Sequence, residues 1–76
     1  MNRLHGHDTL ILHELNDIGG RWQKPGTLTL NLPLPRQEIA SRCRQLHQLG
    51  YLDRGDGAGY RINDSGRRAL RENSDY

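Results

Sequence analysis

One amphipathic segment that runs directly into a glycine-rich turn limits what this chain can fold into more than any other feature. The segment PRQEIASRCRQLHQLG begins with Pro35, a residue favoured in the first turn of a helix, and reaches Gly50, which commonly ends one. At about 100° per residue, the apolar side chains share one side of such a helix. They are Ile39, Cys43, Leu46 and Leu49. The sequence therefore predicts a helix over 35–49 with one buried stripe.

The opposite side of this predicted helix carries hydrogen-bonding groups and a cation but no carboxylate. Its residues are Gln37, Ser41, Arg44 and Gln48. Glutamine and arginine can form paired hydrogen bonds with base edges in the major groove of DNA, whereas an ordinary solvated helix usually mixes both signs of charge. We therefore expect Arg44 and Gln37 to contact base edges, with Ser41 and Gln48 nearby. Arg36, at the start of the helix and to one side, suits a phosphate.

Two short segments of alternating apolar and polar residues follow the helix. Residues 51–54 (YLDR) and 60–62 (YRI) are separated by the cluster GDGAG, and such a cluster between alternating segments is a hairpin signal. Residues 63–72 then begin with capping residues and predict a final helix. A helix followed by a small hairpin is the winged-helix arrangement.

The stretch LHQLGYLDRGDGAGYRINDSGRRAL contains a Leu-Gly-Tyr-Leu step at 49–52 and the step YRINDSGR at 60–67. It resembles the C-terminal half of bacterial winged helix-turn-helix regulators of the MarR/PadR-like kind. There a Leu-Gly-Tyr/Leu-Leu step leads into the wing, and a Tyr-x-Leu-Thr-x-x-Gly-Arg step follows it. The resemblance covers about the last half of the chain and is more specific for fold than for function. It implies that helix 35–49 lies in the major groove and that wing 51–62 lies on the DNA backbone.

Two arginines fall in the predicted wing. In the resembled family the wing contacts phosphates or the minor groove, which implies this role for Arg54 and Arg61. Neighbouring acids, Asp53 and Asp56, are the alternative partners for these two side chains. The sequence leaves both interpretations open.

The stretch before the helix predicted over 35–49 departs from the pattern of the resembled regulators, which have a short second helix there. Leucine occupies every second position over 28–34, and Pro33 would interrupt a helix. We expect a strand over about 27–32, followed at best by a vestigial turn. An alternative register makes 36–43 the second helix, but it leaves too few residues for a third helix before Gly50.

The N-terminal part predicts a helix from Asp8, as its capping residue, through Ile18, ended by Gly19 and Gly20. Residues 1–7 and 73–76 are expected to be flexible. Trp22 lies in the following loop and is expected to fill the core, because the chain has few other large apolar residues. The fold expected is α+β, a single small winged-helix domain over 1–76 of order α-β-α-β-β-α.

Composition excludes several classes of protein. With 76 residues, 33% of them hydrophobic and none of them phenylalanine, the core is small, and a homodimer would add stability. One cysteine cannot form an internal disulfide, and Cys43 is expected to be a buried, inert thiol. No apolar run is long enough for a membrane span and no signal peptide is visible, so we expect a cytoplasmic protein. No metal-ligand or catalytic motif stands out, so we expect neither an enzyme nor a bound cofactor.

The charge balance leaves two hypotheses about function. The formal net charge is only +2, and the basic residues are ten arginines and one lysine. Arginine suits paired contacts to phosphate and guanine, which favours a small regulator that binds double-stranded DNA. Acids lie among the arginines, and Arg42 is expected to pair with Glu38 four residues earlier or with an acid elsewhere. The alternative is a winged-helix module that binds another protein, as a phage or mobile-element modulator of host machinery would.

Overall fold

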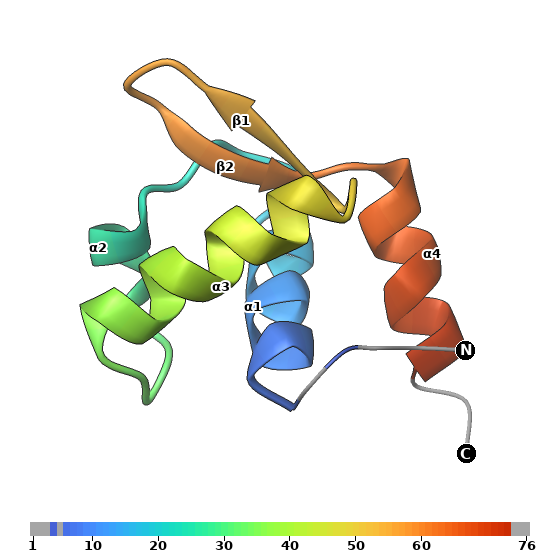
Figure 1. The fold of residues 1–76 in the computed structure, drawn as a ribbon, viewed down its shortest axis with the longest axis horizontal. Coiled ribbons are helices and arrows are strands. Elements are labelled where there is room, and N and C mark those ends of the chain that lie inside the picture. The colour runs from blue at the N-terminus through green and yellow to red at the C-terminus, as the bar shows by residue number, and fades with distance from the viewer. Residues whose placement is uncertain (1–3, 5, 74–76) are drawn as a thin grey trace.

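Four helices and one two-stranded antiparallel sheet make up the part of the chain that the structure, a computed structural model, describes: residue 4 and residues 6–73. The elements are α1 (Gly6–Asp17), α2 (Pro25–Leu28), α3 (Arg36–Gln48), β1 (Leu52–Gly55), β2 (Gly59–Ile62) and α4 (Asp64–Asn73). In Figure 1, α3 crosses in front of α1, the hairpin β1–β2 extends above α3, and α4 stands beside them. The α+β class predicted from the sequence is therefore confirmed.

Helix α1 begins two residues earlier than the sequence suggested. Asp8 lies inside its first turn and is buried, with a carboxylate oxygen 3.8 Å from the guanidinium of Arg42 on α3. The interpretation of Asp8 as the capping residue is therefore wrong, because this carboxylate faces a cation of another helix. The end of α1 agrees with the expectation, since the chain leaves the helix through Gly19 and Gly20, which have φ of 77° and 82°.

Parts of the two ends have a defined place in the fold, and their flexibility stays a prediction. His7 belongs to α1, and Leu4 packs against the core. The final helix extends to residue 73. The remainder of this prediction, residues 1–3, 5 and 74–76, lies outside the described residues.

The strand predicted over 27–32 is wrong. Residues 25–28 form the short helix α2, with Pro25 in its first turn, and turns follow it. The backbone satisfies its hydrogen bonds locally, as when the amide of Leu28 donates to Lys24 O at 3.2 Å and that of Leu32 donates to Leu28 O at 3.1 Å. Leu28 and Leu32 are buried while Leu30 is 81% exposed, so the spacing that matters here is four residues rather than two. The observed order is therefore α-α-α-β-β-α.

Helix α3 matches the helix predicted over 35–49 except at its end. Ile39, Cys43 and Leu46 are fully buried, as the apolar stripe required. Leu49 is 54% exposed, so its place in the buried stripe is wrong. The helix ends at Gln48, and the chain turns at Gly50 with φ of 88°, which leaves Leu49 on the outside of the turn. The alternative register with a separate helix over 36–43 is excluded, because α3 is continuous.

The hairpin forms where the alternating segments predicted it. Its pairs are Leu52 with Ile62, Asp53 with Arg61, Arg54 with Tyr60 and Gly55 with Gly59. An isolated bridge joins Gln23 to Tyr60 on the other side of β2, with both backbone hydrogen bonds at 2.8 Å. The order across the hairpin is therefore residue 23, then β2, then β1.

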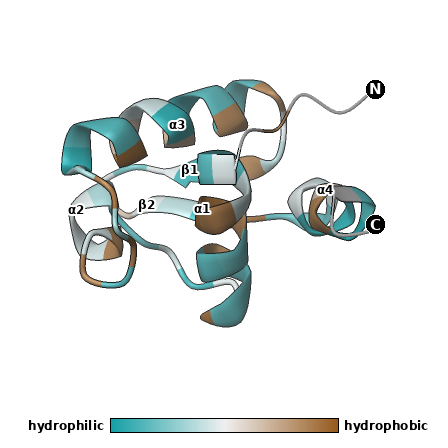
Figure 2. Cartoon of the chain, turned by 90° about the horizontal axis from the view of Figure 1, so that it is seen from below, coloured by the Kyte–Doolittle hydropathy of each residue, from teal (hydrophilic) through white to brown (hydrophobic). Residues whose placement is uncertain are grey.

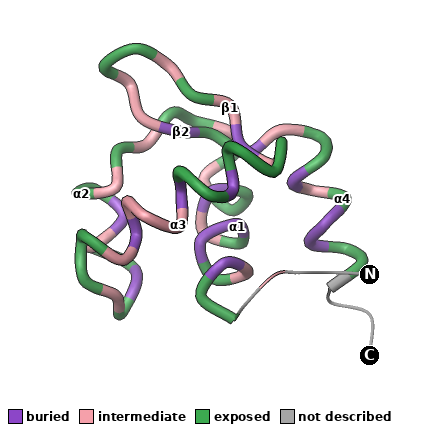
Figure 3. Tube along the Cα trace, in the orientation of Figure 1, coloured by how far each residue is buried: buried purple, intermediate pink, exposed green. Residues whose placement is uncertain are grey.

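The core lies between α1, α3 and the inner face of the hairpin, and α2 and α4 close its two ends. Figure 2 shows hydrophobic residues on α1 and in short bands along an otherwise hydrophilic α3, and Figure 3 shows that the hairpin tip is exposed. The buried apolar cluster consists of Ile11, Leu12, Leu15, Leu28, Leu32, Ile39, Cys43, Leu46, Leu52, Tyr60, Ile62 and Leu70. Within the described part of the chain, no helix combines the length and apolar character that a membrane crossing needs.

Candidate nucleic-acid interface

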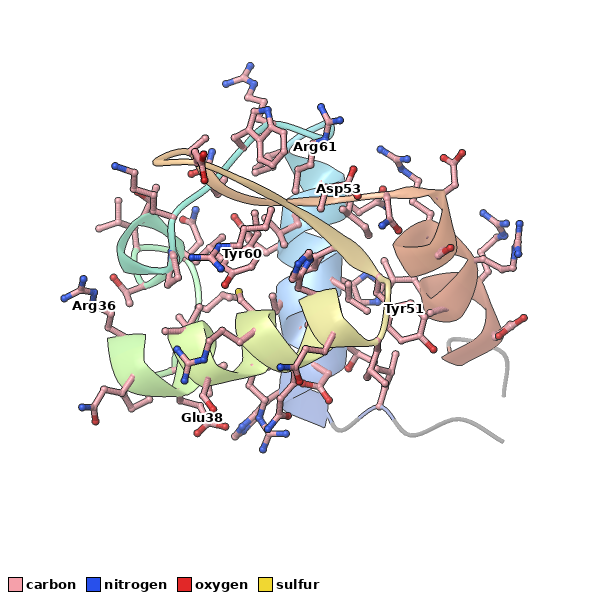
Figure 4. The ribbon with its side chains drawn as sticks, turned by 45° about the horizontal axis from the view of Figure 1, so that its top comes forward. Arg36, Glu38, Tyr51, Asp53, Tyr60 and Arg61 are labelled. Atoms are coloured by element: carbon pink, nitrogen blue, oxygen red, sulfur yellow. The ribbon has the colours of Figure 1, made fainter. Side chains whose placement is uncertain are left out.

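The outward side of α3 is the surface that the sequence singled out. Gln37, Arg44 and Gln48 are exposed and Ser41 is half-buried, opposite the stripe that faces the core. These residues come together because they are spaced by four, three and four positions along one helix. Arg36 is exposed at the first turn, with its side chain close to Gly26 of α2. Figure 4 shows Arg36 at this end of α3.

The arginines divide into two groups by their ion pairs. Arg42, Arg61 and Arg67 each have a carboxylate oxygen within 4 Å. Among the residues that the structure describes, no such pair is found for Arg21, Arg36, Arg44, Arg54, Arg68 or Arg71, nor for Lys24. Three of the four arginines that the sequence proposed as nucleic-acid contacts thus belong to the group without ion pairs, and Arg61 does not.

Arg42 pairs with Glu38 on α3, as the sequence predicted, and it also lies near Asp8 on α1, so that it joins the two helices. Its Nε donates to Glu38 Oε2 at 2.8 Å, and its Nη1 lies 3.8 Å from Asp8. His7 Nδ1 lies 3.3 Å from the same oxygen of Glu38. These hydrogen bonds, first from Arg42 and then from His7, lower the pKa of Glu38. The Glu38 carboxylate therefore has its partners on the flank of α3 that faces α1, away from the Arg44 side.

The register of the hairpin places Arg54 and Arg61 on opposite faces of the sheet. Side chains of directly paired residues share a face, and successive residues along a strand alternate. Arg54 thus shares a face with Tyr60, and both lie on the side of Leu52 and Ile62, which are buried. We call this the inner face. Asp53 and Arg61 share the other face, the outer face, as Figure 4 shows.

The inner face of the hairpin is fixed to α3 through His47. Its Nδ1 lies 2.9 Å from the backbone oxygen of Leu52, and its ring centroid lies 6.2 Å from that of Tyr60. Strand β1, which carries Arg54, is the edge strand of the hairpin and the strand that packs against α3. The inner-face arginine of the hairpin therefore belongs to the strand that packs against α3.

Arg61 has two partners on the outer face. Its guanidinium carbon lies 4.4 Å from the centroid of the Trp22 ring, and its Nε donates to Asp53 Oδ2 at 3.4 Å. Trp22 is 37% exposed, so the expectation that it fills the core is wrong. Its ring lies on the outer face because the bridge of Gln23 with Tyr60 places residue 22 opposite residue 61.

Lys24 is a cation that the sequence analysis missed. It is exposed, stands at the N-terminal end of α2 and has its backbone against the hairpin, since a Cβ on Gly59 would lie 2.7 Å from its nitrogen. The dipeptide Lys24-Pro25 was the available signal, because proline favours the first position of a helix. The strand expected over 27–32 is incompatible with a helix that begins at this dipeptide.

Metal ligation, a thiol and a surface hollow are further chemical features to consider among the described residues. No group of three or more His, Cys, Asp or Glu side chains among them is arranged to hold a metal ion. Burial raises the pKa of the Cys43 thiol to about 12, with a smaller contribution from Asp8, so this thiol is protonated at neutral pH. An open hollow of about 330 Å³ lies between the end of α1, the outer face of the hairpin and α4. Its polar lining includes Asp53, Arg61 and Arg67, which already form ion pairs.

Comparison of the chain with known protein families, with curated proteins and with solved structures found no match.

Proposed function

We propose that this protein is a winged helix-turn-helix domain that binds double-stranded DNA, with α3 in the major groove and the hairpin β1–β2 on the backbone. The order of elements supports this architecture: α1, a one-residue bridge at Gln23, the short helix α2, then α3 and the hairpin. The resembled regulators have a short second helix at this place, and α2 supplies one where the sequence alone predicted a strand.

The observation that carries the proposal is the set of cations without ion pairs around α3. Arg36 and Arg44 on α3 and Arg54 on the adjacent strand have no carboxylate within 4 Å among the described residues, whereas Arg42, on the flank that faces α1, has two. An arginine that is not neutralised inside the protein can bind phosphate or a base edge without first breaking an ion pair. The α3 surface that contains Arg44 therefore offers a polyanion cations that are not already paired.

The spacing along α3 suits reading of base edges. Gln37 and Arg44 are two helical turns apart, about 10.5 Å at 1.5 Å per residue. This distance corresponds to about three base pairs at 3.4 Å each. Arginine pairs with guanine O6 and N7, and glutamine pairs with adenine N6 and N7. We therefore expect a short target step that contains both purines, with Arg36 and Arg54 on flanking phosphates.

A protein of this size with one reading helix would act by occupying its site. Binding would release counterions from the phosphates, and the helix face would set the register. Such a mode supports a role in transcription regulation through competition for a promoter-proximal site. It requires no chemical step and no cofactor.

The test is fluorescence anisotropy with random and promoter-proximal duplexes from 50 to 300 mM salt. We expect a steep log–log dependence of affinity on salt and a preference for one duplex. Arg44→Ala should weaken binding to the preferred duplex by roughly 1–3 kcal/mol, the worth of one paired base contact, and affect random DNA less. Equal losses on both duplexes would contradict base reading by Arg44, and no binding at 50 mM salt would contradict the proposal.

A protein-binding role is the second candidate, and two exposed leucines favour it. Leu30 is 81% exposed in the turn after α2, and Leu49 is 54% exposed after α3. Exposed leucines of this kind suit a protein contact better than a phosphate. If the anisotropy titration shows no binding, a Leu30→Ser/Leu49→Ser variant should lose any partner that the wild-type protein retains in a pull-down.

A further inference from the structure

We propose that Trp22 and Arg61 are positioning residues, which hold the hairpin in place for DNA binding, and that Arg54 is the wing arginine that contacts DNA. This inference rests on the proposed function and gives different roles to two arginines of one hairpin. The family resemblance implied the same role for both arginines, whereas the pairing of the strands places them on opposite faces of the hairpin.

The first step is the geometry of two rows of side chains across the hairpin. The outer face carries the row Trp22, Arg61, Asp53, and the inner face carries the row Gln23, Tyr60, Arg54. In the outer row, the Arg61 guanidinium is held from two sides, by the indole at 4.4 Å and by the Asp53 carboxylate at 3.4 Å. To contact a phosphate beside α3, this guanidinium would have to leave both partners and pass to the other face.

The second step is that the indole touches both strands. It faces Arg61 on β2, and it lies so close to Gly55 on β1 that a Cβ there would fall 3.1 Å from its Cζ3 atom. A two-stranded hairpin alone is marginally stable in water. In this hairpin, the free edge of β2 is held by the isolated bridge of residue 23 with residue 60. Trp22 thus stabilises both the bridge and the pairing of β1 with β2.

The third step is what this arrangement does for Arg54. Arg54 lies on the edge strand, directly opposite Tyr60, whose backbone accepts from and donates to Gln23. Loosening of the outer row therefore loosens the pairing that holds β1, the strand that carries Arg54. A change at Trp22 or Arg61 that removes no charge should then weaken DNA binding through Arg54.

The binding test compares Trp22→Leu and Arg61→Lys, both of which keep the net charge, with Arg54→Gln and with Arg68→Lys on the exposed surface of α4 as the matched control. Trp22→Leu and Arg61→Lys should each weaken binding about three- to fivefold, the size of an exposed cation–π contact, and the double variant should be no worse than either alone. Both should reduce the salt slope toward that of Arg54→Gln, which should be smaller by about 0.9 for one phosphate. Arg68→Lys should match the wild type.

Wild-type binding by Arg61→Lys together with a reduced slope for Arg61→Gln would overturn the inference, because Arg61 would then contact a phosphate itself.

Amide hydrogen exchange tests the positioning role without DNA. The backbone amides of Gln23 and Tyr60 should exchange about three- to fivefold faster in Trp22→Leu and Arg61→Lys, while those of Ile11 and Leu12 in α1 keep their wild-type rates. Unchanged exchange at residues 23 and 60 would overturn the inference whatever the binding data show. Faster exchange in a protein that binds no duplex would support the positioning of the hairpin and contradict only the proposed function.

Discussion

At the scale of single residues, close packing at some positions leaves no space for any side chain larger than that of glycine. Gly59 has φ of 93°, and a Cβ on it would overlap the carbonyl oxygen of Gln23. Gly57, two residues away in the turn, has φ of 69°, and a Cβ there would meet nothing within 4 Å. Both glycines therefore have a positive φ, and they differ in the space beside them.

This pair separates backbone strain from steric overlap. Gly57→Ala should reduce the free energy of unfolding by about 1 kcal/mol, the cost of a left-handed conformation for alanine. Gly59→Ala should reduce it by ~2 kcal/mol or more, because the bridge to Gln23 must also move. Urea unfolding of both variants measures the difference, and equal losses would contradict the close approach of residue 23 to the hairpin.

Cys43 gives an alkaline pH dependence that follows from its burial. Its pKa is raised to about 12 in the folded protein, above the value near 9 of an exposed thiol, because burial disfavours the thiolate. The unfolded thiol therefore loses its proton first. The stabilisation is complete below pH ~9 and declines as the pH rises toward 12, by at most ~1.4 kcal/mol per pH unit.

The measurement is the difference in unfolding free energy between the wild type and Cys43→Ala from pH 8 to pH 11. Tyrosine and lysine titrate in both proteins, so their contributions cancel in the difference. The wild-type advantage should shrink as the pH rises. A constant difference over this range would mean that the thiol titrates normally in the folded protein.

At the scale of elements, Asn63 determines how the hairpin passes into α4. Its Oδ1 accepts from the amide of Gly66 at 2.9 Å, which caps α4. Its Nδ2 donates to Gly50 O at 2.9 Å and to Asp53 Oδ1 at 3.2 Å, so one side chain joins the end of β2 to the turn after α3. The start of α4 thus depends on a residue that also connects two other segments.

Replacement of this residue should destabilise α4 more than replacement of an ordinary surface asparagine. Asn63→Ala should reduce the free energy of unfolding by about 1–2 kcal/mol, because the cap of α4 is removed. Asn16→Ala, at an exposed position of α1, should change it by less than about 0.5 kcal/mol. Circular dichroism during urea unfolding would measure both, and equal values would show that the cap of α4 contributes little.

At the scale of the whole molecule, the placement of charge matters more than its total. The formal net charge is only +2, yet the cations without ion pairs include a group around α3 and the inner face of the hairpin. Others, Arg21, Arg68 and Arg71, lie in the α1–α2 loop and on α4. Replacing three arginines of either group by neutral residues therefore changes the net charge by the same amount.

This equivalence gives a matched test of the proposed DNA interface. Arg36→Gln/Arg44→Gln/Arg54→Gln and Arg21→Gln/Arg68→Gln/Arg71→Gln each remove three positive charges. The first variant should lower the salt slope of DNA binding by about 0.9 for each phosphate that the protein no longer binds, and the second should leave it close to the wild-type value. Equal decreases in fluorescence anisotropy titrations would show that binding follows the net charge rather than the α3 surface.

The sequence by itself determined the elements whose signals are local. The periodic stripe and the terminal Gly50 predicted α3, and the glycine cluster between alternating segments predicted the hairpin, because spacing along one helix or strand decides which side chains share a face. The same reasoning placed Gln37 and Arg44 on one exposed side. It failed over 27–32, where alternating leucines fit a strand that has no partner strand to pair with.

Only the tertiary structure decided which arginines remain available. Arg61 and Arg54 both fall in the predicted hairpin, but the register and the bridge of residue 23 set Arg61 against Trp22 and Asp53 and place Arg54 on the opposite face. Trp22 could not be placed from composition, because its position depends on the backbone pair of the next residue, Gln23, with Tyr60, which is distant in the chain. Hydrophobic patterning is encoded within each element, whereas cross-strand rows and ion pairs arise between elements far apart in the sequence.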